Sequence, residues 1–193
     1  MRLRSIVVLL ASMAGYSNAA PTPEGPTALQ QRASLQLFPN LIINVDKSNP
    51  GASSGAGYTA HMTPTVATVF SFDIPYDINP TCTLSFALPP PGGLFSYTVD
   101  GSGAITVSPI HGVVSSPTSY GAVAPLLGGS YGSFDAASHG GAIGVPCSAG
   151  TTLQVVLYLF NPINRQLLSV GDGTVEFFEL QSPLTGLTLD VSY

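Results

Sequence analysis

The stretch Thr65–Leu88 reads TVATVFSFDIPYDINPTCTLSFAL and consists of two alternating runs on either side of a turn. The apolar residues that share one parity are Val66, Phe70, Phe72 and Ile74 in the first run and Cys82, Leu84, Phe86 and Leu88 in the second. An alternation of period two gives each run one apolar face for a core and one small or polar face outward. Residues 75–80 between the runs contain two prolines and an aspartate, which favour a turn. The stretch predicts two β-strands of a core unit, with Cys82 on its inward face.

The same alternation recurs along much of the remaining chain. It is found in residues 35–45, 95–99, 105–107, 153–159, 175–180 and 187–191. Turn-forming sequences separate these runs, and the run at 95–99 is joined to the next one by Asp100-Gly101-Ser102-Gly103, which is typical of a β-hairpin. No window of twelve residues from residue 35 onward has an apolar stripe at helical spacing. The sequence therefore predicts an all-β protein, an antiparallel β-sandwich of about eight or more short strands.

Residues 111–146 show little periodicity of any kind and are rich in glycine. They predict a long loop with one or two short strands, and long loops are often functional or mobile. Within this segment, residues 121–144 have few large apolar side chains whose burial could offset the entropy lost on ordering. We expect this part to be dispensable for folding and not rigid.

The first 34 residues have a different character from the rest. Residues 1–19 combine two arginines, an apolar stretch of about nine residues and a small-residue site, which is the pattern of a secretory signal peptide. A spanning helix would need ~20 apolar residues. Residues 20–34 are rich in Pro, Thr and Gln and predict a tether or a propeptide. Residues 35–193 form a single predicted domain.

The composition excludes several classes of partner. Only 8% of the 193 residues are charged, against roughly 25% in an ordinary globular domain. Once the two arginines of the signal peptide are removed, Arg32, Lys47 and Arg165 face ten acidic residues, a net charge of −7. So few basic groups cannot neutralise phosphates, and we expect no binding to nucleic acid or to anionic membranes. A weakly ionic surface of this kind is typical of extracellular or wall-embedded proteins.

The two cysteines, Cys82 and Cys147, are the only ones in the chain. A secreted chain reaches an oxidising compartment, where a cysteine pair forms a disulfide. Cys147 stands just before the strong strand predicted at residues 153–159. The expected bond would tie the central unit to the C-terminal strands. The alternative is a pair of buried free thiols.

A catalytic serine is one hypothesis for the glycine-rich segment. Residues 128–132 fit the Gly-x-Ser-x-Gly pattern, and Ser130, Asp135 and His139 follow the order of an α/β-hydrolase triad. That pattern works where the serine sits on a turn between a strand and a helix and its partners come from distant loops. Here no helix is predicted and the three residues lie within ten positions. A flexible loop is the favoured interpretation.

Neither a metal nor a cofactor is predicted. The three histidines, His61, His111 and His139, are scattered, and no zinc-binding spacing accompanies them. A glycosidase needs two carboxylates that face one bond. The nearest pair on one strand, Glu176 and Glu179, is three positions apart, so the two side chains should point to opposite faces.

Aromatic side chains offer a possible route to sugar binding. The chain has eight tyrosines and no tryptophan. The faces of aromatic rings stack on pyranose rings, and six tyrosines are candidates for this contact: Tyr58, Tyr76, Tyr97, Tyr120, Tyr131 and Tyr158. The alternative is that these tyrosines belong to the core and its rim.

Several segments, taken in order, resemble the fungal "ubiquitin 3 binding protein" C-terminal domain family. They are FPNLIINVDKSNP (38–50), VFSFDIP (69–75), CTLSF (82–86), FSYTVDGSGAI (95–105), PCSAGTTLQV (146–155) and VEFFELQSPLTGLTL (175–189). The resemblance covers roughly residues 38–191 and implies a fungal, secreted or surface protein without established catalytic residues. The family name also implies binding to an activating enzyme of a ubiquitin-like modifier. A signal peptide and an oxidised cysteine pair do not fit that activity.

These observations predict a secreted, non-catalytic fungal protein of the cell wall or extracellular space, with a structural or interaction role. A carbohydrate- or protein-binding module is the first alternative, and a secreted serine hydrolase is the second. Partners are expected among cell-wall polysaccharides or other extracellular proteins. The C-terminal residues LTLDVSY lack the apolar tail of a lipid-anchor signal, and no asparagine lies in an N-glycosylation sequon. We therefore expect neither a membrane anchor nor an N-glycan.

Overall fold

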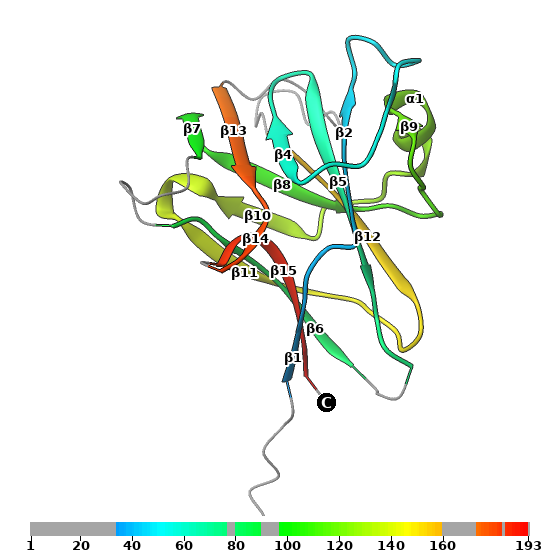
Figure 1. Ribbon diagram of the computed structural model, residues 1–193, viewed down its shortest axis with the longest axis vertical. Coiled ribbons are helices and arrows are strands. Elements are labelled where there is room, and N and C mark those ends of the chain that lie inside the picture. The colour runs from blue at the N-terminus through cyan, green and yellow to red at the C-terminus, as the bar shows by residue number, and fades with distance from the viewer. Residues whose placement is uncertain (1–33, 77–79, 90–96, 160–172, 183, 193) are drawn as a thin grey trace, which may run out of the picture. The chain divides into compact units, whose positions relative to one another are not determined.

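The computed structural model describes residues 34–76, 80–89, 97–159, 173–182 and 184–192 (Figure 1). All of them belong to one compact unit, residues 32–193. The predicted signal peptide, 1–19, and nearly all of the predicted tether, 20–34, lie outside the described residues. Within the described part of the chain, no helix has the length and apolar character that would be needed to cross a membrane.

The main sheet is antiparallel throughout the described pairings, which confirms the prediction of an all-β, antiparallel fold. In spatial order its strands are β1 (Ser34–Leu37), β15 (Leu184–Ser192), β6 (Thr81–Ala87), β11 (Gly140–Val145), β10 (Gly132–Asp135), β8 (Ala104–Pro109), β12 (Thr152–Leu159), β5 (Val66–Asp73) and β2 (Leu41–Asp46). A short strand, β14 (Leu180–Gln181), pairs with β15 to one side of this series. The two alternating runs predicted within residues 65–88 correspond to β5 and β6.

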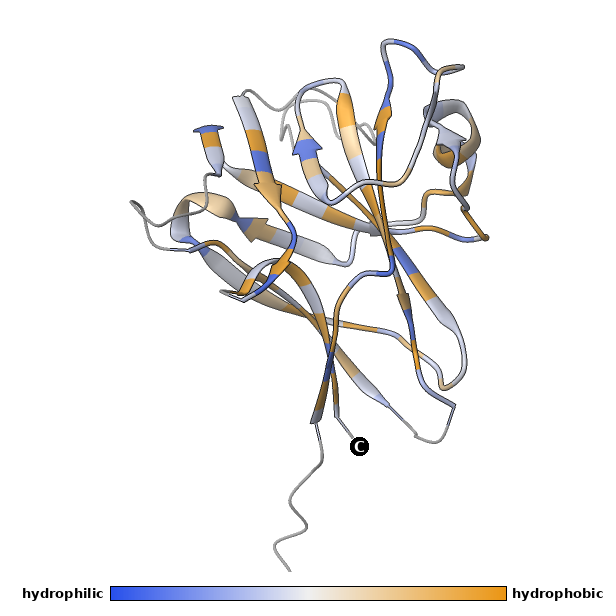
Figure 2. Cartoon of the chain, in the orientation of Figure 1, coloured by the Kyte–Doolittle hydropathy of each residue, from blue (hydrophilic) through white to orange (hydrophobic). Residues whose placement is uncertain are grey.

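A smaller sheet packs against one face of the main sheet. Its strands are β4 (Thr59–Met62), β13 (Gly173–Phe178) and β7 (Thr98–Gly101). Phe177 of β13 stacks on Phe70 and meets the ring of Phe86 edge-on, with ring centroids 6.4 and 5.3 Å apart. Figure 2 shows hydrophobic residues recurring along the strands of both sheets. The apolar core therefore lies between two antiparallel sheets, as the alternation predicted.

The opposite face of the main sheet is also covered. Val69 of β5 and Val156 of β12 belong to a second apolar cluster that includes Val123 of the short helix α1 (Tyr120–Val123). The side chain of Gln154 donates to the carbonyl oxygen of Val114 and accepts from its backbone N–H, both at 2.8 Å. These bonds hold the loop that carries Val114 against the sheet. Strand β12 is consequently buried on both faces, despite the polar residue within it.

The main sheet curls into a half-barrel whose two edge strands are consecutive in the sequence. β1 pairs with β15 at one edge, and β2 pairs with β5 at the other. Figure 1 shows the chain passing from β1 to β2 across the open side. Only residues 38–40 make this crossing. The backbone N–H of Asn40 donates to the carbonyl oxygen of Ser71 at 2.9 Å, and its side chain donates to Asp73.

The glycine-rich segment, 111–146, is more ordered than the predicted long loop. It contains a two-residue strand, β9 (Thr118–Ser119), which pairs with β3 (Ser53–Ser54), the helix α1 and two short 3₁₀ turns. It also contains β10 and β11, which lie inside the main sheet, where β11 pairs with β6 along its whole length. The ring of Phe134 is 3% exposed and stacks on Phe86 with 5.5 Å between centroids.

Close packing explains why this segment has so many glycines and so little apolar period. A Cβ atom at Gly140 would lie 3.0 Å from the carbonyl oxygen of Phe86, and one at Gly141 would lie 3.0 Å from the ring of Phe134. The glycines therefore allow two strands and a ring to approach closely. The expectation that residues 121–144 are dispensable for folding was wrong, because β10 and β11 join β6 to β8.

We expect the amides of β10 and β11 to exchange with solvent as slowly as those of β6, because they are paired within the same sheet. Native-state hydrogen exchange followed residue by residue by NMR would measure this. Residues 111–117, which precede β9, provide a matched loop in the same segment. Fast exchange throughout residues 132–145 would contradict the sheet assignment.

The predicted disulfide between Cys82 and Cys147 is present in the structure, with 6.0 Å between the Cα atoms. Cys82 lies on β6 and is 1% exposed, which confirms its predicted inward orientation. Cys147 lies between β11 and β12. The bond closes a loop of 65 residues and connects two parts of the main sheet.

Candidate functional site

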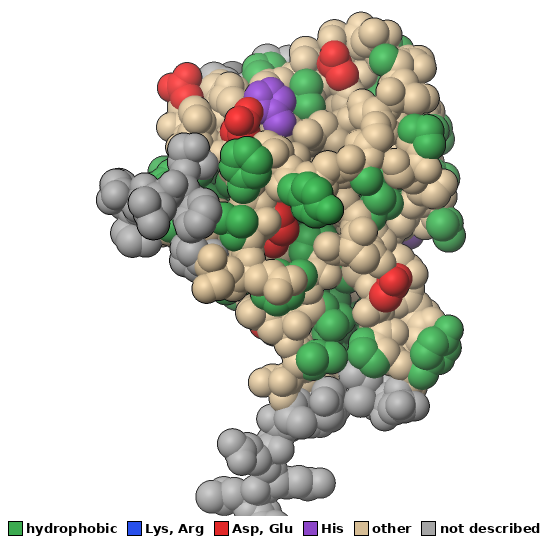
Figure 3. Space-filling model, in the orientation of Figure 1, with side chains coloured by type: hydrophobic (Ala, Val, Ile, Leu, Met, Phe, Trp, Pro, Cys, Tyr) green, Lys and Arg blue, Asp and Glu red, His purple; other side chains and the backbone are tan. Residues whose placement is uncertain are grey.

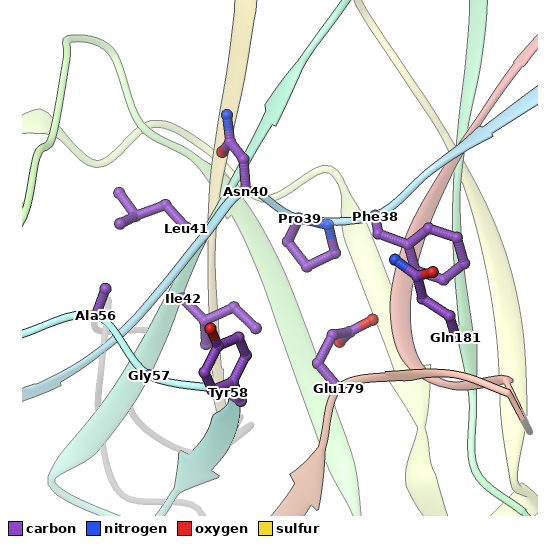
Figure 4. Close-up of a pocket in the computed structure, with 10 residues that line it drawn as sticks. All are labelled: Phe38, Pro39, Asn40, Leu41, Ile42, Ala56, Gly57, Tyr58, Glu179 and Gln181. Atoms are coloured by element: carbon purple, nitrogen blue, oxygen red, sulfur yellow. The ribbon is translucent and has the colours of Figure 1, made fainter.

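A pocket of about 340 Å³ lies where the chain crosses between the two edges of the main sheet (Figure 4). Its lining comes from three separate segments of the sequence. The ten lining residues are Phe38, Pro39, Asn40, Leu41, Ile42, Ala56, Gly57, Tyr58, Glu179 and Gln181. The volume is near the lower end of the range of about 300–1,000 Å³ that is usual for ligand sites.

Backbone hydrogen bonds fix the three segments to one another. The N–H of Gly57 donates to the carbonyl oxygen of Ile42, and the N–H of Glu179 donates to the carbonyl oxygen of Tyr58, both at 2.9 Å. Tyr58 immediately precedes β4, whereas Glu179 separates β13 from β14. The pocket is thus formed on the rigid frame of two sheets rather than on a free loop, which favours a preformed site.

Glu179 provides a carboxyl group within the pocket. Figure 4 shows this group pointing toward the Phe38–Pro39 segment. Its Oε2 atom accepts a hydrogen bond of 3.0 Å from the backbone N–H of Leu187. Its Oε1 atom is buried and has no hydrogen-bond partner among the described residues. A buried polar atom without a partner is uncommon and costs free energy, so this atom is a candidate ligand contact.

Burial raises the pKa of Glu179 from 4.5 to about 8, against the opposing effect of the hydrogen bond from Leu187. At neutral pH the group is therefore mostly a neutral carboxylic acid, which can donate a hydrogen bond. Gly186 makes room for this carboxyl group. Its φ of +106° suits glycine, and a Cβ at this position would collide with the Glu179 side chain.

Tyr58 is 81% exposed. Its backbone is nevertheless fixed, because its carbonyl oxygen accepts from Glu179 and the preceding residue, Gly57, donates to Ile42. Phe178, at the end of β13, is a second exposed aromatic residue, at 47%. It is paired with Thr59, the residue next to Tyr58. Of these two exposed rings, only that of Tyr58 belongs to a residue that lines the pocket. An exposed aromatic ring on a fixed backbone is a suitable platform for stacking.

The outer face of the small sheet carries a close contact between a histidine and a glutamate that the sequence did not predict. The Nδ1 atom of His61 lies 2.6 Å from Oε2 of Glu176, and both side chains are partly exposed. Val175 and Phe177, on either side of Glu176, point into the core. Glu176 and Glu179 accordingly point to different faces, as their spacing predicted. In Figure 3 acidic and hydrophobic groups are scattered over the face shown, and no basic colour is visible among its described side chains.

The candidate triad residues have other partners. Ser130 Oγ lies within hydrogen-bond distance of the carbonyl oxygens of Val107 and Gly132, at 3.2 and 3.0 Å. Asp135 accepts from the backbone N–H of Ala137 at 2.9 Å and so caps the short turn that follows it. His139 Nδ1 lies 3.2 Å from the hydroxyl of Tyr97. Among the described hydrogen bonds, none joins two of the three candidates.

The six candidate tyrosines divide into two groups. Tyr58 and Tyr76 are exposed, at 81% and 83%. The other four are wholly or partly buried: Tyr97, Tyr120, Tyr131 and Tyr158. The hydroxyl of Tyr158, for example, bonds to Ser108 at 3.1 Å inside the protein. Tyr58 and Tyr76 are therefore the two tyrosines whose rings are exposed enough to stack on a sugar. Of these, only Tyr58 is among the residues that line the described pocket.

Residues 37–183 match the family described as "Ubiquitin 3 binding protein But2 C-terminal domain". The chain belongs to this family. The match includes every residue that lines the pocket. It also includes both cysteines of the disulfide.

Two curated But2-like relatives come from Schizosaccharomyces pombe, and both are described as uncharacterized but2-like proteins. One is 29% identical over 97% of this chain and 39% of its own length. The other is 28% identical over 80% of this chain and 40% of its own length. The chain therefore spans about two fifths of the length of these relatives. No solved structure matches the But2-like chain.

Metal ligands do not gather in the described part of this But2-type domain. Among the described residues, no group of three or more His, Cys, Asp and Glu side chains could hold a metal ion. His61 is paired with Glu176, and His139 with Tyr97. The pocket at the crossing segment, with Tyr58 at one side and Glu179 within it, is the strongest candidate site.

Proposed function

We propose that this But2-type domain is a secreted, non-catalytic fungal protein that binds neutral carbohydrate of the cell wall or extracellular matrix. The observation that carries the proposal is the 81% exposed ring of Tyr58 beside the pocket. A pocket with one aromatic platform, apolar walls and a few polar groups suits a sugar ring, which has both apolar faces and hydroxyl edges.

The charge of the pocket supports a neutral ligand. No lysine, arginine or histidine is among the ten described residues that line it. An anionic ligand would enter such a site without a compensating positive charge, at a considerable desolvation cost. The net negative charge of the chain would also repel an anionic ligand. A neutral polysaccharide carries no charge to desolvate and is not repelled by the acidic chain.

The arrangement of carboxylates supports a binding role rather than hydrolysis. Retaining and inverting glycosidases generally use two carboxyl groups on either side of the scissile bond. Glu179 is the single carboxyl group among the ten described lining residues. Glu176 lies on the outer face of the small sheet and is paired with His61. The pocket thus offers one acid and no facing partner.

The disulfide supports the extracellular location. Such bonds persist in oxidising compartments and are rare where thiols are kept reduced. The signal-like sequence of residues 1–19 agrees with this location. Both features support an extracellular location for the proposed binding activity.

Protein binding is the second candidate function. The family description attributes binding of ubiquitin 3 to But2 itself. The exposed ring of Phe178, which is outside the pocket lining, supports a protein partner, because aromatic residues are enriched at protein interfaces. Loss of binding on replacing Phe178 but not Tyr58 would support this alternative.

Replacing Tyr58 with alanine should weaken retention on insoluble fungal wall polysaccharide by roughly tenfold, because an aromatic contact contributes about 1 kcal/mol or more. Co-sedimentation of purified secreted protein with β-glucan and with chitin would measure this. Tyr76→Ala is the matched control, since Tyr76 is 83% exposed but lies against Gly150, outside the pocket lining. Equal retention of both variants and the unchanged protein would contradict the proposed site.

A further inference from the structure

One of the residues that line the pocket, Glu179, has a buried oxygen atom without a hydrogen-bond partner among the described residues. Oε2 of Glu179 is occupied by the N–H of Leu187, whereas Oε1 is buried without a partner. Both atoms belong to a residue that lines the pocket. A ligand that filled this space would therefore meet a carboxylic acid with one free position.

We propose that the pocket recognises an N-acetylated hexosamine unit, whose acetamido carbonyl oxygen accepts a hydrogen bond from the buried carboxylic acid of Glu179. This inference rests on the proposed carbohydrate-binding function and names the sugar class. It requires three contacts: a donor for the carbonyl oxygen, an apolar surface for the methyl group, and an aromatic face for the sugar ring.

Each of the three contacts has a counterpart in the pocket. Glu179 supplies the donor. The apolar surface is available from Phe38 and Pro39, which lie on the crossing segment. Tyr58 supplies the aromatic face. Figure 4 shows the Glu179 carboxyl group pointing toward the Phe38–Pro39 segment, so donor and apolar surface face the same space.

Hydroxyl-only sugars fit this arrangement less well. A glucose ring has no methyl group to cover the apolar walls, which would then face the polar edge of the sugar. The acetamido group also has an N–H that needs an acceptor, and the amide oxygen of Gln181 is available among the lining residues. The side chain of Asn40 is already bonded to Asp73. The volume of about 340 Å³ accommodates one sugar unit rather than a chain.

The electrostatic surroundings keep Glu179 in the form that the contact requires. The elements packed around it are the crossing segment, the residues before β4, and strands β13, β14 and β15. From these elements, the titratable groups among the pocket-lining residues are Glu179 and Tyr58. The raised pKa of Glu179 has burial as its first cause. Binding should consequently persist below pH 8 and weaken above it.

Isothermal titration calorimetry with soluble tetramers of N-acetylglucosamine and of glucose would test the inference on the intact secreted protein. At pH 6 we expect the N-acetylated tetramer to bind at least tenfold more tightly than the glucose tetramer. Equal affinities would overturn the inference but leave the carbohydrate-binding function standing. Absence of binding to either tetramer, together with no effect of Tyr58→Ala on polysaccharide retention, would overturn both.

Glu179→Gln tests the role of the acid, because the amide keeps a donor that does not titrate. We expect the affinity of the unchanged protein for the N-acetylated tetramer to fall about tenfold between pH 6 and pH 9.5, and that of Glu179→Gln to change less than twofold. Glu176→Gln, on the outer face of the small sheet, should behave like the unchanged protein. Circular dichroism in the same buffers monitors folding. The same pH dependence in Glu179→Gln would overturn the assigned contact.

Discussion

Replacing Cys82 and Cys147 together with alanine should lower the free energy of unfolding by about 4 kcal/mol. The disulfide closes a loop of 65 residues, and removing it restores conformational freedom to the unfolded chain. Against a typical total of ~5–15 kcal/mol for a domain, this loss is large. The smaller volume of alanine at the buried Cys82 would add to it. Urea denaturation followed by fluorescence of the tyrosines would measure the change.

The reduced protein provides the control for this prediction. Dithiothreitol should destabilise the unchanged protein by a similar amount and leave the double variant unaffected. Thiol titration of denatured, unreduced protein should find no reactive thiols. Two reactive thiols per chain, or a double variant as stable as the oxidised protein, would contradict the structural role assigned to the bond.

The stability of the protein should fall as the pH rises from about 5 to 9, and Glu179→Gln should remove much of this dependence. The folded state holds the Glu179 proton up to a pKa of about 8, whereas the unfolded chain releases it near 4.5. Between these values the folded state binds more protons, so stability decreases with increasing pH. The full shift corresponds to ~5 kcal/mol, and with allowance for partial solvent access and local relaxation we expect ~3 kcal/mol.

The comparison is made between variants at each pH, so that other titrating groups cancel. At pH 5 the unchanged protein and Glu179→Gln should be similar in stability, and at pH 9 the variant should be the more stable. Glu176→Gln controls for loss of a carboxylate that is not within the pocket. Thermal unfolding monitored by circular dichroism at several pH values would detect the difference. Parallel pH profiles for Glu179→Gln and the unchanged protein would refute the prediction.

The parts of the fold that the sequence predicted are those whose strands bury one face. In β6, Cys82, Leu84 and Phe86 point inward and alternate with partly or fully exposed residues, so the period of two is directly visible. The disulfide was predicted because Cys82 lies at an inward-facing position of this alternation and the chain has only two cysteines. These features depend on local pattern, which a single sequence contains.

The ordered glycine-rich segment could not be predicted in the same way. In β11, Gly140 closely approaches the carbonyl oxygen of Phe86 on β6, and Gly141 closely approaches the ring of Phe134 on β10. A glycine chosen for its lack of a side chain leaves no apolar period. Its packing role depends on partners about 50 residues away in the case of Phe86, and that distance cannot be read from the segment itself.

The candidate site was predicted only in part. Tyr58 was one of six tyrosines, and its exposure, which distinguishes it from Tyr97 or Tyr158, depends on tertiary packing. Glu179 had no distinguishing signal, because its burial results from the return of the chain to Leu187. The crossing segment, residues 38–40, contributes the remaining part of the pocket lining, and its position also depends on the tertiary fold. The pocket is therefore a property of the topology rather than of any one motif.

The pairing of the first described strand with the last has a consequence for folding order. Ser34 of β1 lies opposite Ser192 of β15, and β15 also pairs with β6 along seven residues. A chain emerging from the ribosome cannot complete either pairing until β15 has been made. Sheets that depend on such distant pairings form slowly and leave unpaired edges exposed while they wait. The nascent domain should therefore remain open until residues 184–192 have left the ribosome.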